Sequence, residues 1–147
     1  MCGICGILYF DGTPARREEV APMVDMLVHR GPDQGNVIVD GSCALGNRRL
    51  AILDLSPDGA LPMYSVDKQQ IVAYNGEIYN HPHIRRTLEL EGLRYRTNSD
   101  TESLLKLYRR DGAEMVRSLR GMFAFALWDH KNQSLLLARD RMGEKPL

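Results

Sequence analysis

The chain has 147 residues, of which 44% are hydrophobic and 26% charged, a composition typical of one globular domain with a sizeable core. Nineteen Lys and Arg residues balance nineteen Asp and Glu residues, so no net field attracts nucleic acid or an anionic membrane surface. No apolar run approaches the roughly 18 residues of a membrane span, and the amino terminus lacks the pattern of a signal peptide. We therefore expect a cytoplasmic protein.

The first part of the sequence combines strand patterns with one helix pattern. Turn residues separate four β-prone segments, and we predict strands at residues 2–10, 37–39, 43–45 and 50–55. Asp40-Gly41 is a dipeptide suited to a hairpin turn between the second and third of these. Apolar residues at helical spacing predict a helix within 15–29, which ends at Gly31-Pro32.

The second part of the sequence places helices between further strands. Strand patterns occur at 70–74, 122–128 and 135–138. Helices are predicted at 82–91, from the capping box Ser99–Glu102 through Tyr108, and around 116–119. Asn75-Gly76 indicates a turn or a positive φ after the first of these strands. Runs of strands at both ends with helices between them favour an α+β fold over a doubly wound parallel sheet.

The end of the sequence, residues 139–147, has no predicted closing element. We therefore expect a C-terminally truncated domain, cut from a longer protein. An open sheet edge at this end would favour a homodimer or aggregation.

Cys2 is the sharpest chemical feature of the sequence. Removal of Met1 would leave Cys2 with both a thiol and a free α-amino group. An α-amino pKa of about 7.7–8.0 lies near neutral pH, so the amine can take the thiol proton without a histidine. The alternative is that a cysteine at the second position is incidental.

Cys2 and Cys5 also form a C-x-x-C pattern, which suits a thiol-redox or metal site. Residues three apart on a strand point to opposite faces of the sheet, which argues against a shared metal or disulfide. The third thiol is Cys43, and the four histidines lack a convincing ligand spacing. We expect no metal site, with Cys5 and Cys43 as small buried residues.

Seven short motifs occur in order along nearly the whole chain: Met1-Cys2-Gly3-Ile4, Arg30-Gly31-Pro32-Asp33, Arg49-Leu50-Ala51-Ile52-Leu53-Asp54, Asn75-Gly76-Glu77-Ile78-Tyr79-Asn80, Ser99-Asp100, Gly121-Met122-Phe123-Ala124-Phe125 and Arg139-Asp140-Arg141. Together they resemble the class II glutamine amidotransferase domain of glutamine-hydrolysing asparagine synthetases. The resemblance implies one domain over 1–147 with an N-terminal-nucleophile hydrolase fold. That fold is a four-layer αββα sandwich, with two antiparallel sheets between helical layers.

The resemblance also implies a reaction. Cys2 would attack the side-chain amide of glutamine, release ammonia from a tetrahedral oxyanion, and leave a thioester that water hydrolyses to glutamate. The Asn75 side-chain amide and the Gly76 backbone N–H would stabilise the oxyanion.

The same resemblance assigns the charged groups of the substrate. Arg49 would bind the carboxylate, because its planar guanidinium suits a bidentate contact. Arg48 has the same chemistry, and only the motif register favours Arg49. Asp100 would bind the substrate ammonium with a contribution from Glu77, although an acid in a first helical turn is also stabilised by the helix dipole.

The parent protein implied by the resemblance would add a C-terminal synthetase domain that uses ATP and Mg²⁺ to amidate aspartate or a related carboxylate. We expect no cofactor in this chain. Cys5 stands where the family has a small residue, and residues 59–63 are more apolar than is usual there. The rival interpretation is an inactive or regulatory glutamine-binding module, which retention of Met1 would produce.

Overall fold

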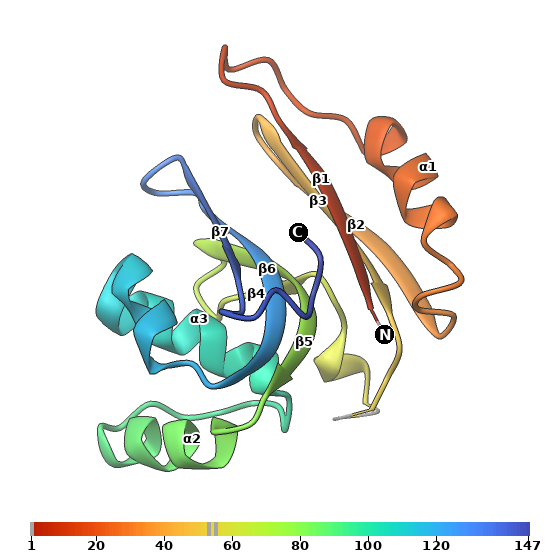
Figure 1. The fold of residues 1–147 in the computed structure, drawn as a ribbon. Coiled ribbons are helices and arrows are strands. Elements are labelled where there is room, and N and C mark those ends of the chain that lie inside the picture. The colour runs from red at the N-terminus through yellow and green to blue at the C-terminus, as the bar shows by residue number, and fades with distance from the viewer. Residues whose placement is uncertain (1, 53, 55) are drawn as a thin grey trace.

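The computed structural model describes residues 2–52, 54 and 56–147, and these residues form two antiparallel sheets (Figure 1). The three-stranded sheet has the order β1-β3-β2, and the four-stranded sheet has the order β4-β5-β6-β7. The strands are β1 (Gly3–Leu8), β2 (Gln34–Asp40), β3 (Cys43–Arg49), β4 (Met63–Tyr64), β5 (Gln70–Ile78), β6 (Gly121–Asp129) and β7 (Ser134–Arg139).

Helices cover the outer faces of the two sheets (Figure 1). The helix α1 (Arg17–Met26) packs on the three-stranded sheet, while α2 (His81–Leu90) and α3 (Asp100–Asp111) lie on the far side of the four-stranded sheet. Two 3₁₀ segments, η1 (Pro57–Gly59) and η2 (Gly112–Ser118), complete the helical elements of the described residues. This arrangement is the four-layer αββα sandwich, so the predicted fold class is confirmed.

Three apolar layers hold the sandwich together. Under α1, small side chains such as Val20 and Val24 meet the three-stranded sheet. Between the sheets, the layer includes Leu45 and Trp128. The largest cluster lies between the four-stranded sheet and the helices α2 and α3, and it includes Phe123, Phe125, Leu127, Leu88 and Leu104. The strand β6 supplies two of these layers because its successive side chains point to opposite faces.

Local sequence signals explain most element ends. The β2–β3 hairpin closes at the pair Asp40 and Cys43, and Gly41 adopts the positive φ of 57° that its turn requires. The helix α3 begins after Ser99, whose side chain accepts a hydrogen bond from the Thr101 N–H at 3.2 Å. Gly112 ends this helix with a φ of 58°.

The predicted turn at Asn75-Gly76 is wrong. The strand β5 continues through both residues to Ile78, where they pair with Ala124 and Phe123 of β6. A Cβ atom at Gly76 would lie 2.3 Å from the Met122 carbonyl oxygen. Glycine therefore allows the close approach of β6 here instead of a change of chain direction.

The strand predicted at 50–55 is also wrong where the structure can test it. The strand β3 ends at Arg49, and residues 50–52 belong to no strand. Asp54 has a φ of 53°, which is incompatible with an extended strand. Leu53 and Leu55 lie outside the described residues.

The chain ends near the open edge of the three-stranded sheet (Figure 1). Pro146 and Leu147 border a cavity of about 500 Å³ together with residues of β1.

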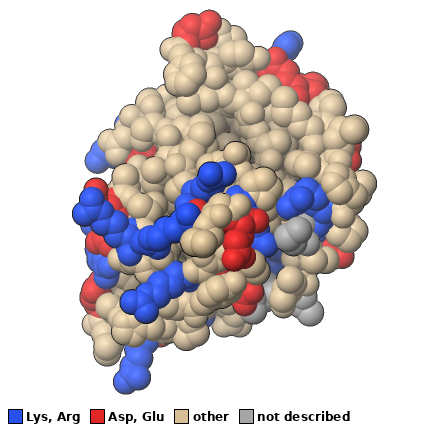
Figure 2. All heavy atoms as spheres, in the orientation of Figure 1, with Lys and Arg blue, Asp and Glu red and all other residues tan. Residues whose placement is uncertain are grey.

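Figure 2 shows basic and acidic side chains close together on one face of the molecule. No helix in the described part of the chain combines the length and the apolar character needed to cross a membrane.

Candidate active site

All six residues predicted to form the site line one cavity of about 90 Å³: Cys2, Arg49, Asn75, Gly76, Glu77 and Asp100. One water molecule needs roughly 10–15 Å³ in this measure, so the cavity accommodates several waters or part of a small polar molecule. The larger cavity beside β1 is mainly apolar, and of the six residues only Asn75 borders it. The residues predicted to carry the chemistry therefore converge on the smaller cavity.

Cys2 is half-buried directly before β1. The Leu50 backbone N–H donates to the Cys2 Sγ atom at 3.4 Å, and the Cys2 thiol donates to the Leu50 carbonyl oxygen at 3.8 Å, so the backbone of Leu50 positions the sulfur. Arg30 Nε donates to the Cys2 carbonyl oxygen at 3.0 Å and so fixes the backbone of Cys2. Met1, whose removal would free the Cys2 α-amino group, lies outside the described residues.

Asn47 connects the segments that carry Cys2, Arg49 and Asn75. Its side chain is fully buried. The Nδ2 group donates to the Gly3 carbonyl at 3.0 Å and to the Arg48 carbonyl at 3.1 Å, while Oδ1 accepts from the Tyr74 N–H at 2.7 Å. These neighbours adjoin Cys2, Arg49 and Asn75 in sequence. A single amide thus holds β1, β3 and β5 in register at the cavity.

Arg49 is the last residue of β3, and its side chain is buried. Its Nη2 group donates to the Asp54 carbonyl oxygen. Arg48, the chemical alternative from the sequence, does not line this cavity, and its guanidinium lies against Gly35 of β2. The alternation of side chains along β3 therefore places Arg49, and not Arg48, at the cavity.

Asp100 is the first residue of α3 and is only 4% exposed. One of its carboxylate oxygens, Oδ2, accepts from the Tyr74 hydroxyl and from the Ile78 N–H, each at 2.8 Å. The helix dipole adds to the stabilisation of this negative charge. Glu77, the other predicted acid, lies exposed at the rim of the cavity.

Tyr74 is a cavity residue that the sequence analysis missed. Burial, and then the neighbouring Asp100 carboxylate, raise the pKa of Tyr74 well above its usual value, so the hydroxyl stays a hydrogen-bond donor. Nothing in the sequence separated this tyrosine from an ordinary aromatic core residue of a strand.

Lys145 is a second cavity residue without a predicted role, and it is 5% exposed. The preceding turn is folded around the Asp140 carboxylate, which accepts from the N–H groups of Phe123, Glu144 and Lys145 at 2.9–3.1 Å. These backbone hydrogen bonds, that of Glu144 above all, lower the pKa of Asp140 to about 2. The available sequence signal was the Arg139-Asp140-Arg141 motif, which begins this turn.

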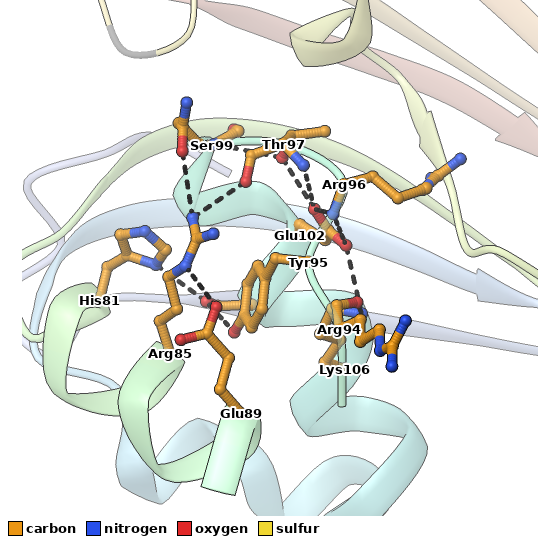
Figure 3. A network of polar contacts seen from close by, with 12 residues as sticks. His81, Arg85, Glu89, Arg94, Tyr95, Arg96, Thr97, Ser99, Glu102 and Lys106 are labelled. Atoms are coloured by element: carbon orange, nitrogen blue, oxygen red, sulfur yellow. Dashed lines mark hydrogen bonds and ion pairs between the residues drawn. The ribbon is translucent and has the colours of Figure 1, made fainter. Parts of the chain in front are cut away.

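The loop before Asp100 is held by the polar network in Figure 3. Both Glu102 carboxylate oxygens accept from backbone N–H groups of Arg96 and Thr97, and Lys106 lies 3.2 Å away. Burial opposes the charge of Glu102, but the hydrogen bonds from Thr97 and Arg96 lower its pKa overall. The predicted capping box is thus half correct, because Glu102 binds this loop and not the Ser99 N–H.

The other two cysteines lie away from the polar cavity. Burial raises the pKa of Cys5 to about 11 and that of Cys43 to about 12, with a smaller effect of Asp40 on Cys43. Cys5 packs with the apolar cluster under α1. Among residues 2–52, 54 and 56–147, no group of three or more His, Cys, Asp or Glu side chains is arranged to hold a metal ion.

Comparison with known proteins places this chain in a family. The family model described as a glutamine amidotransferase domain matches residues 1–147. The chain is 43% identical to an asparagine synthetase [glutamine-hydrolyzing] of Asparagus officinalis and 40% identical to asparagine synthetase [glutamine-hydrolyzing] 1 of Bacillus subtilis strain 168, each over 100% of this chain. It spans 25% and 24% of the lengths of these curated relatives.

A solved structure supports the same fold. The glutamine phosphoribosylpyrophosphate amidotransferase of B. subtilis, solved with ADP and GMP, superposes with a TM-score of 0.74 at 22% identity. The superposition covers 93% of this chain and 37% of that one. With the family model matched from end to end, this chain belongs to the glutamine amidotransferase domain family.

Proposed function

We propose that this domain hydrolyses L-glutamine to glutamate and ammonia through a thioester on Cys2. One observation carries the proposal: a thiol, an amide, and charged groups of both signs converge on one small cavity. The names of the relatives at 40–43% identity support glutamine as the nitrogen donor.

The first step is attack of the Cys2 sulfur on the side-chain carbonyl carbon of glutamine. The carbonyl oxygen becomes an oxyanion, for which Asn75 Nδ2 and the Gly76 N–H are the proposed donors. Collapse of this intermediate breaks the C–N bond, and the leaving nitrogen takes a proton to depart as ammonia. Water then attacks the thioester, releases glutamate and returns the thiol.

The free α-amino group of Cys2, formed when Met1 is removed, is the proposed base. It takes the thiol proton, passes it to the leaving nitrogen, and then activates the water. The Leu50 backbone, whose N–H donates to Sγ at 3.4 Å, holds the sulfur in place beside the amine.

Substrate recognition needs two opposite charges, because glutamine carries a carboxylate and an ammonium on one carbon atom. We assign the carboxylate to Arg49 and the ammonium to Asp100, with Glu77 contributing from the rim. Tyr74 keeps the Asp100 carboxylate oriented through its 2.8 Å hydrogen bond. These charged contacts gain strength because both Arg49 and Asp100 are buried, where the local dielectric is lower than in bulk water.

The whole protein is proposed to be an asparagine synthetase. In this proposal, ammonia passes to a synthetase domain that uses ATP and Mg²⁺ to amidate aspartate or a related carboxylate. We place the reaction in the cytoplasm, where a reducing environment keeps Cys2 as a thiol. The open edges of β1 and β7 are the proposed contact for a homodimer, which sedimentation would detect.

The Cys2→Ala variant tests the central claim. We expect it to lose all glutamate release and to form no covalent adduct with an electrophilic glutamine analogue, because no other residue replaces the sulfur. Cys5→Ala is the matched control, since Cys5 packs away from the cavity, and it should keep both properties. Unchanged labelling of the Cys2 variant would refute the assignment.

Mass spectrometry of the intact protein tests the rival interpretation. A chain that retains Met1, binds glutamine and releases no glutamate would be a binding or regulatory module. A chain that begins at Cys2 and releases glutamate supports the hydrolytic function.

A further inference from the structure

Asp54 contacts both segments that bind the charged groups of the substrate. Its backbone carbonyl accepts a hydrogen bond from Arg49 Nη2. Its side-chain Oδ2 accepts from the Asn98 backbone N–H at 2.8 Å. Asn98 lies two residues before Asp100 in the same loop. One residue therefore connects the proposed carboxylate-binding arginine to the proposed ammonium-binding acid.

The backbone conformation and the side-chain hydrogen bonds of Asp54 fit this double contact. Its φ of 53° is left-handed, a region that Asp tolerates better than most residues. The second carboxylate oxygen, Oδ1, accepts from the Ser56 N–H at 3.1 Å and from the Ser56 hydroxyl. The Ser56 hydroxyl and then the Asn98 N–H lower the pKa of Asp54, so the carboxylate is charged at neutral pH.

Gly59 packs tightly against the contact between Arg49 and Asp54. A Cβ atom at this position would lie 2.6 Å from Arg49 Nη2 and 2.7 Å from the Asp54 carbonyl oxygen. The guanidinium thus has no room to move away on that side. Its hydrogen bond to Asp54 is part of a packed structure.

The loop that receives the Asp54 carboxylate is fixed from its other side. Arg85 donates to the Thr97 carbonyl at 3.0 Å and to Asn98 Oδ1 at 3.3 Å, while Glu102 holds the N–H groups of Arg96 and Thr97 (Figure 3). With the loop anchored on α2 and α3, Asp54 links this fixed loop to the Arg49 side chain.

We propose that Asp54 is a positioning residue that sets the spacing between Arg49 and Asp100 and thereby selects free α-amino acids. This inference rests on the proposed function. A substrate with both a carboxylate and an ammonium on one carbon needs both partners at one fixed spacing. A compound with one of these groups uses one partner and gains nothing from the spacing.

The test compares L-glutamine with two analogues, 5-amino-5-oxopentanoate, which lacks the ammonium, and 4-aminobutanamide, which lacks the carboxylate. Asp54→Gly removes the carboxylate and permits the left-handed φ, whereas Asp54→Asn keeps an acceptor oxygen. Asp58→Gly, the same change at an exposed acid four residues after Asp54, is the matched control. Affinities are measured by calorimetry and competition in the Cys2→Ala background, and KM and kcat in the parent background.

We expect Asp54→Gly to weaken L-glutamine binding about tenfold, within the range usual for coupled binding groups, and to change the affinity of each analogue less than twofold. KM for glutamine should rise by a similar factor with kcat nearly unchanged. Asp54→Asn should recover most of the loss, and Asp58→Gly should match the parent.

Two results would overturn the positioning role alone. One is equal weakening of glutamine and of both analogues, and the other is no weakening at all, in protein whose parent form binds and hydrolyses glutamine. If the parent form neither binds nor hydrolyses glutamine, the proposed function is refuted, and the positioning role with it.

Discussion

The two sheets contribute different halves of the site and rest on different cores. The three-stranded sheet supplies the Cys2 thiol and Arg49, and it packs on α1 through small side chains. The four-stranded sheet supplies Asn75 and Gly76, and Asp100 lies on its helical layer, which contains the largest apolar cluster. Asp100, proposed to bind the substrate ammonium, therefore lies on the half with the larger apolar cluster. The site forms only where the half with the smaller cluster under α1 packs against it.

Polar contacts join the two sheets in addition to the apolar packing between them. Asn47 crosses from β3 to β5 and also reaches β1. At the far end of the sheets, the Trp128 indole N–H donates to Asp40 Oδ2 at 2.6 Å. A buried amide with both its oxygen and its nitrogen bonded specifies one arrangement, because any slip leaves these groups unsatisfied.

Truncation of one buried side chain in each apolar cluster tests how much that cluster contributes to the free energy of unfolding. Leu104→Ala in the large cluster should lower the free energy of unfolding by about 3 kcal/mol, since it leaves a cavity in a fully buried site. Val20→Ala under α1 removes fewer methyl groups and should cost about 1.5 kcal/mol. Urea unfolding provides both values. A loss for Val20→Ala as large as that for Leu104→Ala would contradict these expected values.

Asp100→Asn tests the charge that the four-stranded half contributes. We expect kcat/KM for glutamine to fall about 100-fold, because a buried charge-assisted contact to the ammonium is lost. Steady-state kinetics of glutamate release provides the measurement. Glu77→Gln at the exposed rim should have a smaller effect. The reverse order would assign the ammonium to Glu77.

Arg49→Lys tests the charge that the three-stranded half contributes. A lysine keeps the positive charge but loses the planar, forked geometry, so KM should rise about tenfold while kcat changes little. Arg48→Lys is the matched control because Arg48 does not line the cavity. An unaltered KM for the Arg49 variant would place the carboxylate elsewhere.

Asp140 provides the smallest and most pH-specific effect, at the turn that carries Lys145. Its pKa in the folded protein is about 2, below the ordinary value of 3.8. The stabilisation is thus complete above pH 3.8 and is lost as the pH falls toward 2. Asp140→Asn should flatten the pH dependence of the urea midpoint in this window. An identical slope in both proteins would show that Asp140 does not contribute.

The sequence predicted the layers better than the details that join them. Helical and strand periodicity identified most elements because each one buries one face. The turn signal of Asn75-Gly76 failed because pairing along the whole of β5 and β6 outweighs a two-residue preference. Likewise, Glu102 leaves the capping box because its carboxylate binds the N–H groups of Arg96 and Thr97, in the loop directly before the helix.

For the candidate site, the motif residues were likewise predicted from the sequence, whereas the contacts that join them were not. The six expected residues do line one cavity. They could be predicted because their motifs were recognisable as a set, although their individual roles stay predictions. Tyr74, Asn47 and Asp54 were not singled out, since their contacts join segments that are far apart in the chain. No local pattern of residues encodes such contacts.

Asn47 also bears on when the protein becomes competent during its synthesis. Its amide is satisfied only after residue 74 has emerged and docked, which is half a chain later than the thiol. A newly made amino-terminal segment therefore contains the Cys2 thiol before the rest of the candidate site has formed. We expect activity to arise abruptly, with the meeting of the two sheets, and not to grow by degrees as translation proceeds.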